Sequence, residues 1–169
     1  MKKPMKAWIG LAILEFAVGA ALLMTIFLAL RNQVDRKHTA AELAEAASGA
    51  LANGEQSREA EGWELRKYYG ISEEDVEEFV LRLPVTNMDA AELCIVKCIG
   101  DEAARTVAEA MKKRREEQIN LFENYGVEQM KLLNAARAFS VGPYAVLIID
   151  ERADDAAAAV LKLTGGHAE

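Results

Sequence analysis

Few residues in this sequence have the types and spacing that catalysis or metal binding requires. The chain of 169 residues contains two histidines, His38 and His167, which are too far apart to form a metal-ligand pair such as H-x-x-x-H. None of the serines stands in a G-x-S-x-G motif; they are Ser48, Ser57, Ser72 and Ser140. The sequence therefore predicts no catalytic residue, no metal ligand and no cofactor.

Acidic side chains are concentrated in one short segment, which raises the question of calcium binding. The segment contains Glu73, Glu74, Asp75, Glu77 and Glu78. It lacks the alternating D-x-D-x-D-G pattern and the terminal glutamate of a calcium loop. We therefore expect a solvated run of charges at a helix start or on an edge strand, and calcium binding is the less favoured alternative.

Two polar residues, Asn87 and Asp89, lie in a turn-rich link that follows Leu83-Pro84. Their side chains could bind a ligand. Asparagine and aspartate in such links more often satisfy backbone groups of their own turn. The second role is favoured, and ligand binding stays open as the alternative.

The two cysteines, Cys94 and Cys98, fall in an apolar segment over 92–99 that is typical of a strand. Residues four apart in a strand share a face but lie about 13 Å from each other. That separation is too large for a disulfide. We expect two buried thiols and not the disulfide framework of a small secreted protein.

Residues 112–115 (Lys-Lys-Arg-Arg) form the one basic block of the chain. Such a block could contact anionic lipid or wall polymer. Glu109 lies four residues before Lys113, and Glu116 and Glu117 follow the block, so pairing on a helix surface is expected. A solvated helix face is the favoured interpretation.

The strongest pattern in the chain is an almost wholly apolar run over residues 7–30. At about 1.5 Å per residue, a helix of this length crosses the roughly 30 Å hydrocarbon layer of a bilayer. A signal peptide usually has a shorter apolar region of about 7–15 residues and then a cleavage site. The sequence therefore predicts an uncleaved transmembrane anchor, preceded by a basic leader (1–6) and followed by a juxtamembrane linker (31–38).

The charges around this span predict its orientation. Lys2, Lys3 and Lys6 precede it, which favours a cytoplasmic N-terminus by the positive-inside tendency. We expect a single-pass protein of the cell membrane with its main domain outside the cytoplasm. Glu15 lies inside the span, where it is either a contact to a partner helix or, as favoured, a single tolerated acid.

The balance of charge excludes one class of partner. The chain has a formal net charge of −7 at pH 7, and the part after the span is more acidic still, since three lysines precede the span. Phosphate binding needs a net basic face, and the low aromatic content of 7% argues against base stacking. Nucleic acid is therefore not an expected partner.

The periodicity of the remaining chain predicts one α+β domain over 39–164 and a short tail over 165–169. Thr39 is expected to cap a first helix, and a second helix is expected from about Ser57 to Gly70. Strands are then expected at about 77–84, 92–99, 135–141 and 144–149, with helices over 101–124, 127–134 and 152–164. This order predicts a helical entry region and a strand-strand-helix-strand-strand-helix domain. Its sheet would be four-stranded, mainly antiparallel and covered by helices on one face.

Two groups of residues resemble a known family. The first group lies over 83–97 and the second over 117–129; they consist of Leu83-Pro84, Asn87-Met88-Asp89-Ala90, Glu92-Leu93, Ile95-Val96-Lys97, Glu117-Gln118, Phe122, Tyr125 and Gln129. In this order they are similar to a bacterial family, DUF4358, a domain of unknown function. The resemblance covers about 39–164 and implies a small α+β domain behind a membrane anchor or lipoprotein signal, with no assigned activity. The chain departs from the lipoprotein-type members by lacking the lipid-carrying cysteine, and it has Val127 where a helix-starting proline is expected.

These observations favour a non-enzymatic binding or accessory domain of the bacterial cell envelope, with a protein partner there. Two alternatives stay open. The first is an envelope enzyme, or a subunit of one, which uses carboxylates that the sequence does not assign. The second is a structural membrane protein that associates with itself.

Overall fold

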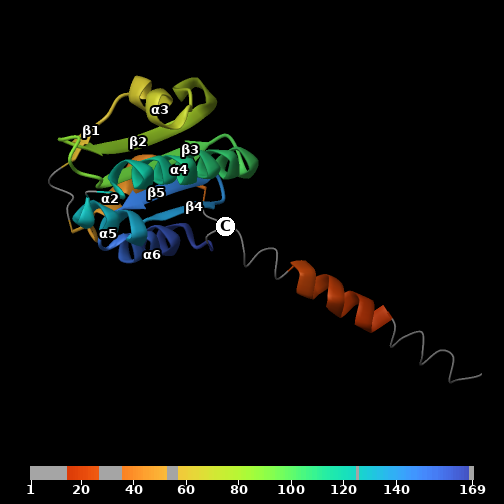
Figure 1. Cartoon of the computed structure of the whole chain (residues 1–169). Coiled ribbons are helices and arrows are strands. Elements are labelled where there is room, and N and C mark those ends of the chain that lie inside the picture. The colour runs from red at the N-terminus through yellow and green to blue at the C-terminus, as the bar shows by residue number, and fades with distance from the viewer. Residues whose placement is uncertain (1–14, 27–35, 53–56, 125, 168–169) are drawn as a thin grey trace, which may run out of the picture. The chain divides into compact units, whose positions relative to one another are not determined.

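The computed structural model describes residues 15–26, 36–52, 57–124 and 126–167 (Figure 1). Its contacts divide the chain into two units, Met1–Gln33 and Val34–Glu169. In the first unit, residues 15–26 are helical with exposed side chains, and Glu15 is the first of them. The strands and helices described below all belong to the second unit.

The predicted transmembrane anchor requires correction. Residues 7–14 and 27–30 of that span lie outside the described residues, as does the leader over 1–6. A helix over 15–26 is only about 18 Å long. In the described part of the chain, no helix combines the length and the apolar character that crossing a membrane needs. This finding contradicts the single N-terminal membrane span, the membrane as a partner, and the assignment to the cell membrane.

Within the described part of the second unit, five antiparallel strands form one sheet in the order β1-β2-β3-β5-β4. The strands are β1 (Ser57–Glu59), β2 (Val76–Pro84), β3 (Glu92–Cys98), β4 (Arg137–Val141) and β5 (Tyr144–Ile149). The prediction of four strands is therefore wrong. The additional strand, β1, lies where a helix was expected to begin, and it pairs Ser57–Glu59 with residues 82–84 of β2.

Helices precede, connect and follow these strands along the chain. They are α2 (Ala40–Ser48), α3 (Gly62–Tyr69), α4 (Asp101–Phe122), α5 (Val127–Ala135) and α6 (Ala153–Thr164), with a 3₁₀ turn η2 (Glu73–Asp75) before β2. Thr39 caps α2 as predicted, because its hydroxyl accepts from the N–H of Glu42 while the Glu42 carboxylate accepts from the Thr39 N–H. From β2 onward the order is strand, strand, helix, helix, strand, strand, helix, so it differs from the predicted strand-strand-helix-strand-strand-helix domain by the separate helix α5.

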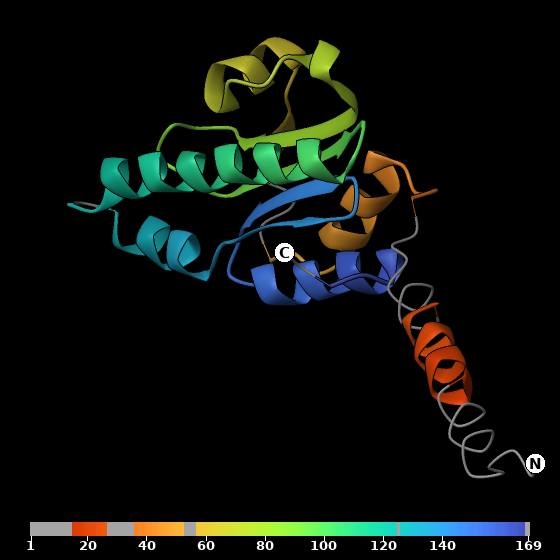
Figure 2. The ribbon, with the colours of Figure 1, turned by 90° about the vertical axis from the view of Figure 1, so that its right-hand side faces the viewer.

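Helices cover both faces of the sheet, which corrects the expectation of a single covered face. One face packs against α3, α4 and α5; its strand residues include Leu81, Leu83, Cys94, Val96, Leu147 and Ile149. The other face packs against α2 and α6, which lie side by side (Figure 2); its strand residues include Leu93, Ile95, Val146 and Ile148. The domain therefore has three layers, and every residue of β5 is buried.

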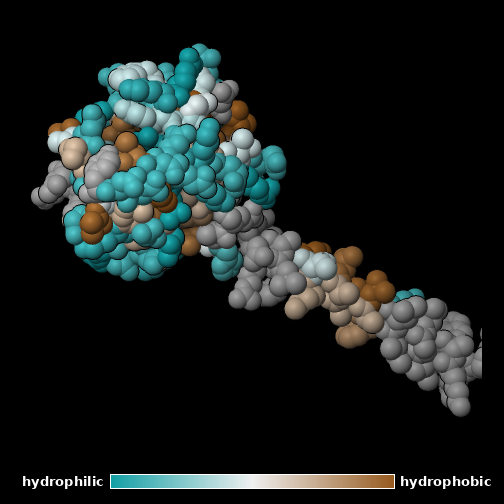
Figure 3. Space-filling view, viewed as in Figure 1, coloured by the Kyte–Doolittle hydropathy of each residue, from teal (hydrophilic) through white to brown (hydrophobic). Residues whose placement is uncertain are grey.

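The outer surface of α4 is hydrophilic along its length (Figure 3). Its inward surface carries Ala104, Val107, Met111 and Phe122, which are all buried. The long helix thus has the amphipathic pattern of a surface helix. Two polar residues on this inward side, Arg114 and Gln118, are exceptions to that pattern, and they contribute to the site described next.

Candidate functional site

A groove with a cavity volume of about 280 Å³ lies between α3, the link after β2 and α4. Its lining residues are Arg58, Tyr68, Leu83, Pro84, Thr86, Asn87, Asp89, Arg114, Gln118 and Leu121. In α4, the residues Arg114, Gln118 and Leu121 lie at positions i, i+4 and i+7 and so share one face of the helix. Residues of β1, α3, β2 with the link that follows it, and α4 therefore meet at this groove.

A buried carboxylate, Glu92, holds the inner side of the groove together. Its side chain is fully buried at the first position of β3, and it forms an ion pair with Arg114, with 3.1 Å between Oε2 and Nη2. It also accepts a hydrogen bond from the Tyr69 hydroxyl and one from Nε2 of Gln118 at 3.4 Å. Three donors from two helices thus satisfy one buried charge, as a buried carboxylate requires.

The Glu92 carboxylate also affects the titration of its neighbours. Burial, followed by the proximity of Glu92, holds the pKa of the Tyr69 hydroxyl well above its ordinary value. Burial alone would lower the pKa of Arg114, but the charge of Glu92 and its hydrogen bonds outweigh burial and raise it. Tyr69 therefore stays a neutral donor and Arg114 stays a cation.

A second arginine on the groove, Arg58 of β1, is held in a similar way. Its Nη1 and Nη2 donate to both carboxylate oxygens of Glu64 in α3, at 3.0 and 2.6 Å. Glu64 is buried, and the hydrogen bonds from Arg58 lower its pKa despite the opposing effect of burial. Both arginines of the groove are thus fixed by carboxylates behind them, and little rotamer freedom is left to lose when a ligand binds.

An aromatic ring forms part of the same wall. The Arg114 guanidinium lies over the Tyr68 ring at 4.6 Å from its centroid, and Lys67 approaches the same ring at 4.9 Å. Tyr68 and Tyr69 are neighbours in α3, yet Tyr69 reaches into the core and Tyr68 lines the groove. Gly70 ends this helix in a left-handed conformation with φ of +69°.

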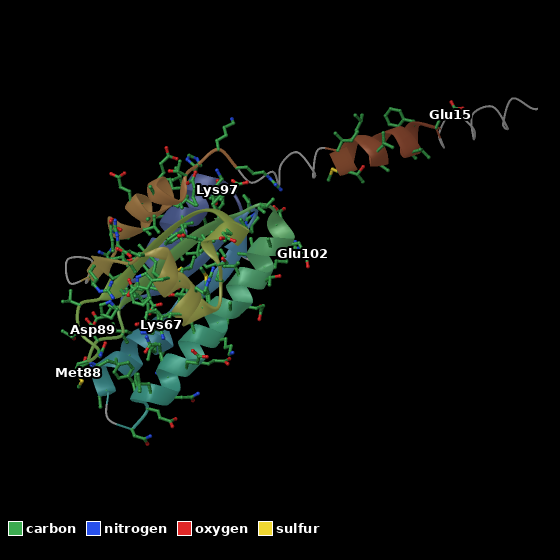
Figure 4. All side chains as sticks on the ribbon, turned by 90° about the horizontal axis from the view of Figure 1, so that it is seen from above. Glu15, Lys67, Met88, Asp89, Lys97 and Glu102 are labelled. Atoms are coloured by element: carbon green, nitrogen blue, oxygen red, sulfur yellow. The ribbon has the colours of Figure 1, made fainter. Side chains whose placement is uncertain are left out.

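The link over 85–91 forms the outer rim. The Asp89 Oδ1 accepts from the N–H of Ala91 at 3.0 Å, and Nε2 of Gln129 in α5 donates to the Met88 carbonyl at 2.6 Å. Figure 4 shows Met88 and Asp89 together in this link. Both roles considered for Asp89 are therefore compatible, because one oxygen satisfies a backbone group while the residue lines the groove.

The other predicted residues do not line the groove. Cys94 and Cys98 are buried and unpaired, as expected. In the acidic run, Lys97 pairs with Glu77 and Glu78, and Glu78 also accepts from the N–H of Ala40 at the start of α2. Among the described residues, no cluster of His, Cys, Asp and Glu could hold a metal ion.

The histidines do not line the groove either. His38 lies beside Glu42, with 3.1 Å between Nδ1 and Oε2, and His167 is exposed near the end of the chain.

The helical period places the four residues of the basic block on different sides of α4. Lys112 and Lys113 are exposed and pair with Glu109 and Glu117 respectively, so Glu109 pairs with Lys112 and not with Lys113. In contrast, Arg114 turns inward to Glu92, and Arg115 donates to the Leu133 carbonyl at 2.7 Å. The interpretation as a solvated helix face holds for the two lysines only.

Residues of the site, or directly behind it, that were missed from sequence include Arg58, Glu64, Tyr68, Tyr69 and Glu92, and Arg114 was considered only as part of the basic block. One signal was present in the sequence. A charged residue at the start of the buried segment over 92–98 needs a partner of opposite charge, and Glu92 is that residue.

One family model matches the chain, over residues 51–150. This range includes every residue that lines the groove. No curated protein and no solved structure matches the chain. Because the match covers more than half of the sequence, the chain belongs to the DUF4358 family, a domain of unknown function.

Proposed function

We propose that residues 39–164 form a non-enzymatic binding domain, which holds a small polar ligand in the groove between α3, the link after β2 and α4. The main support for this proposal is that two arginines from distant elements, Arg58 and Arg114, line one cavity of about 280 Å³. Each guanidinium is fixed in advance by a buried carboxylate. A concave site with a few converging polar groups is the usual form of a small-ligand site.

The state of the carboxylates supports binding over catalysis. A glycosidase-type enzyme needs one carboxyl group that gives up a proton and a second that attacks or takes one. Behind this groove, Glu64 and Glu92 are both engaged by arginines. The hydrogen bonds from Arg58 lower the pKa of Glu64, and the oxygens of both carboxylates are occupied by arginine donors. The groups of the groove are arranged to hold a ligand in place and not to exchange protons with it.

The test is a ligand-observed NMR screen of the full chain. The panel contains acetate, succinate, ethanolamine, L-leucine, L-glutamate and glucose, each added separately. We expect saturation transfer to at least one member, and we expect that member to be recovered chemically unchanged after prolonged incubation. A bound member that is converted to product would contradict the proposal, as would a panel with no bound member.

A blocking variant connects binding to the groove. Asn87 is exposed and lines the groove, so Asn87→Trp fills the cavity without disturbing the core. The matched control is Asn134→Trp, at an exposed position of α5 outside the groove lining. We expect the first variant to lose the saturation transfer and the second to keep it, and the reverse result would place binding elsewhere.

A further inference from the structure

The groove brings charges of both signs into one small cavity. Arg58 and Arg114 line it, and Asp89 contributes a carboxylate from the link. Behind the arginines, Glu64 and Glu92 add one negative charge each. These five groups carry two positive and three negative formal charges, so the groove offers little attraction to a ligand that is only an anion. A ligand with both charges can use both kinds of partner.

Both arginines keep N–H groups that their ion pairs do not use. Glu64 accepts from Nη1 and Nη2 of Arg58, and Glu92 accepts from Nε and Nη2 of Arg114. Among the described residues, no acceptor takes a hydrogen bond from Nε of Arg58 or from Nη1 of Arg114. These N–H groups are suited to a ligand carboxylate, because hydrogen bonds between two charged groups are the short and strong ones.

The opposite charge has its partner in the link. Asp89 uses Oδ1 for the N–H of Ala91, and within the described part of the chain its Oδ2 has no hydrogen-bond donor. A half-buried carboxylate oxygen of this kind can accept from an ammonium group. Its position in the rim is stabilised from outside by the bond between Gln129 and the Met88 carbonyl.

The rest of the wall has polar residues, Thr86, Asn87 and Gln118, as well as apolar ones, and the cavity is small. Leu83, Pro84 and Leu121 supply the apolar surface, and 54% of Leu121 is exposed. The volume of about 280 Å³ lies below the roughly 300 Å³ at which pockets for drug-sized ligands begin. A cavity of this size can accept a single amino acid.

From these observations we infer that the ligand is a free α-amino acid with an apolar side chain. Its carboxylate binds at Arg58 and Arg114, its ammonium group binds at Asp89, and its side chain packs on Leu83 and Leu121. This inference rests on the proposed function, because it names the ligand class of the same groove.

Isothermal titration calorimetry on the full chain tests the inference with L-leucine and three analogues. Leucinamide lacks the carboxylate, 4-methylpentanoate lacks the amine, and glycine lacks the side chain. We expect L-leucine to bind at least about tenfold more tightly than each analogue, since one hydrogen bond between charged groups, or the burial of a leucine side chain, is typically worth that factor. If 4-methylpentanoate binds as tightly as L-leucine, the inference is overturned and the proposed function still stands.

Two further outcomes separate the inference from the proposed function. Tighter binding of the dipeptide Gly-Leu than of L-leucine would identify a peptide terminus and overturn the free amino acid. If none of these compounds binds while another member of the NMR panel does, the inference fails and the binding domain remains. If no member of either set binds, both fail together.

A single substitution at Asp89 tests the assignment of the ammonium group. Asp89→Asn keeps an Oδ1 for the N–H of Ala91 and removes the charge. We expect it to weaken L-leucine binding at least about tenfold and not to weaken the binding of 4-methylpentanoate, an anion that loses a repelling charge. The control is Asp155→Asn, at an exposed residue of α6 that pairs with Arg152. Equal losses for both ligands, or no loss for L-leucine, would overturn the assignment.

Discussion

The guanidinium of Arg114 lies 3.1 Å from the carboxylate of Glu92, although the two residues are 22 positions apart and Glu92 is fully buried. This pair joins α4 to the first residue of β3 and forms the inner side of the groove. Because α4 also covers one face of the sheet, the same contact supports both the fold and the candidate site. The two roles can be separated by experiment.

The first prediction concerns the stability that this pair provides. Replacing Arg114 by alanine leaves the Glu92 charge buried without its cation, which typically costs about 3–5 kcal/mol of unfolding free energy. We expect a loss of about 3 kcal/mol in urea denaturation. Lys113→Ala, at the neighbouring exposed position, should change stability by less than about 0.5 kcal/mol. Equal effects of the two substitutions would show that the pair does not stabilise the domain.

The second prediction concerns pH. The folded state lowers the pKa of Glu64 below its ordinary value of 4.5, mainly through hydrogen bonds from Arg58. A carboxylate with a lowered folded pKa stabilises the protein above the unfolded pKa, and this contribution is lost as pH falls through the folded value. The stability difference between the wild type and Glu64→Gln should therefore be largest near neutral pH and should shrink below about pH 4.5.

Denaturation curves at several pH values measure this difference. The control is Glu102→Gln, whose side chain is 91% exposed on α4 at a distance from the link (Figure 4). An identical pH profile for the two variants would mean that the loss of any acidic charge has the same effect. In that case the pair between Arg58 and Glu64 would not be the cause.

The third prediction concerns the thiols. Burial, with a smaller effect of Glu77, raises the pKa of Cys98 to about 11, and burial raises the pKa of Cys94 further still. The thiolate is the reactive form, so both cysteines should resist Ellman's reagent at pH 8 in the folded protein. Both should react rapidly in denaturant. Fast modification of either one under native conditions would contradict the buried assignment.

The fourth prediction concerns Gly126, between α4 and α5. A Cβ at this position would lie 2.8 Å from Cδ1 and 3.0 Å from Cβ of the buried Phe122. Phe122 has little room to move, so Gly126→Ala should destabilise the domain by about 1–3 kcal/mol, in the range of overpacked cores. Thermal unfolding measures the effect. Gly49→Ala is the control, because its Cβ would have only ordinary contacts at 3.8 Å.

Much of the fold could be predicted from local patterns. Alternation predicted β2, the apolar segments over 92–99 and 144–149 predicted β3 and β5, and Thr39 predicted the start of α2. We predicted that helices cover only one face of the sheet, even though β3 has apolar residues on both of its sides. Leu93 and Ile95 face α2 and α6, whereas Cys94 and Val96 face α4. Apolar residues on both faces of a strand are the pattern of a sheet covered on both sides.

The candidate site was only partly predictable because it depends on long-range contacts. Asn87 and Asp89 were identified from turn chemistry, and both line the groove. Arg114 belongs to a basic block that resembles a solvated surface, and its burial depends on which turn of α4 meets Glu92. Spacing along the sequence does not determine that contact.

A ¹H–¹⁵N correlation titration of the full chain with L-leucine and, separately, with 4-methylpentanoate locates the binding site. We expect the backbone signals that shift to belong to the link over 85–91 and to the turns of α4 near Arg114 and Gln118. Signals from α6 and β4 should stay in place, because they lie at a different surface of the domain. Shifts confined to that other surface would contradict the claim that this groove is the binding site, and no shift with either compound would contradict the inference that its ligand is an apolar amino acid.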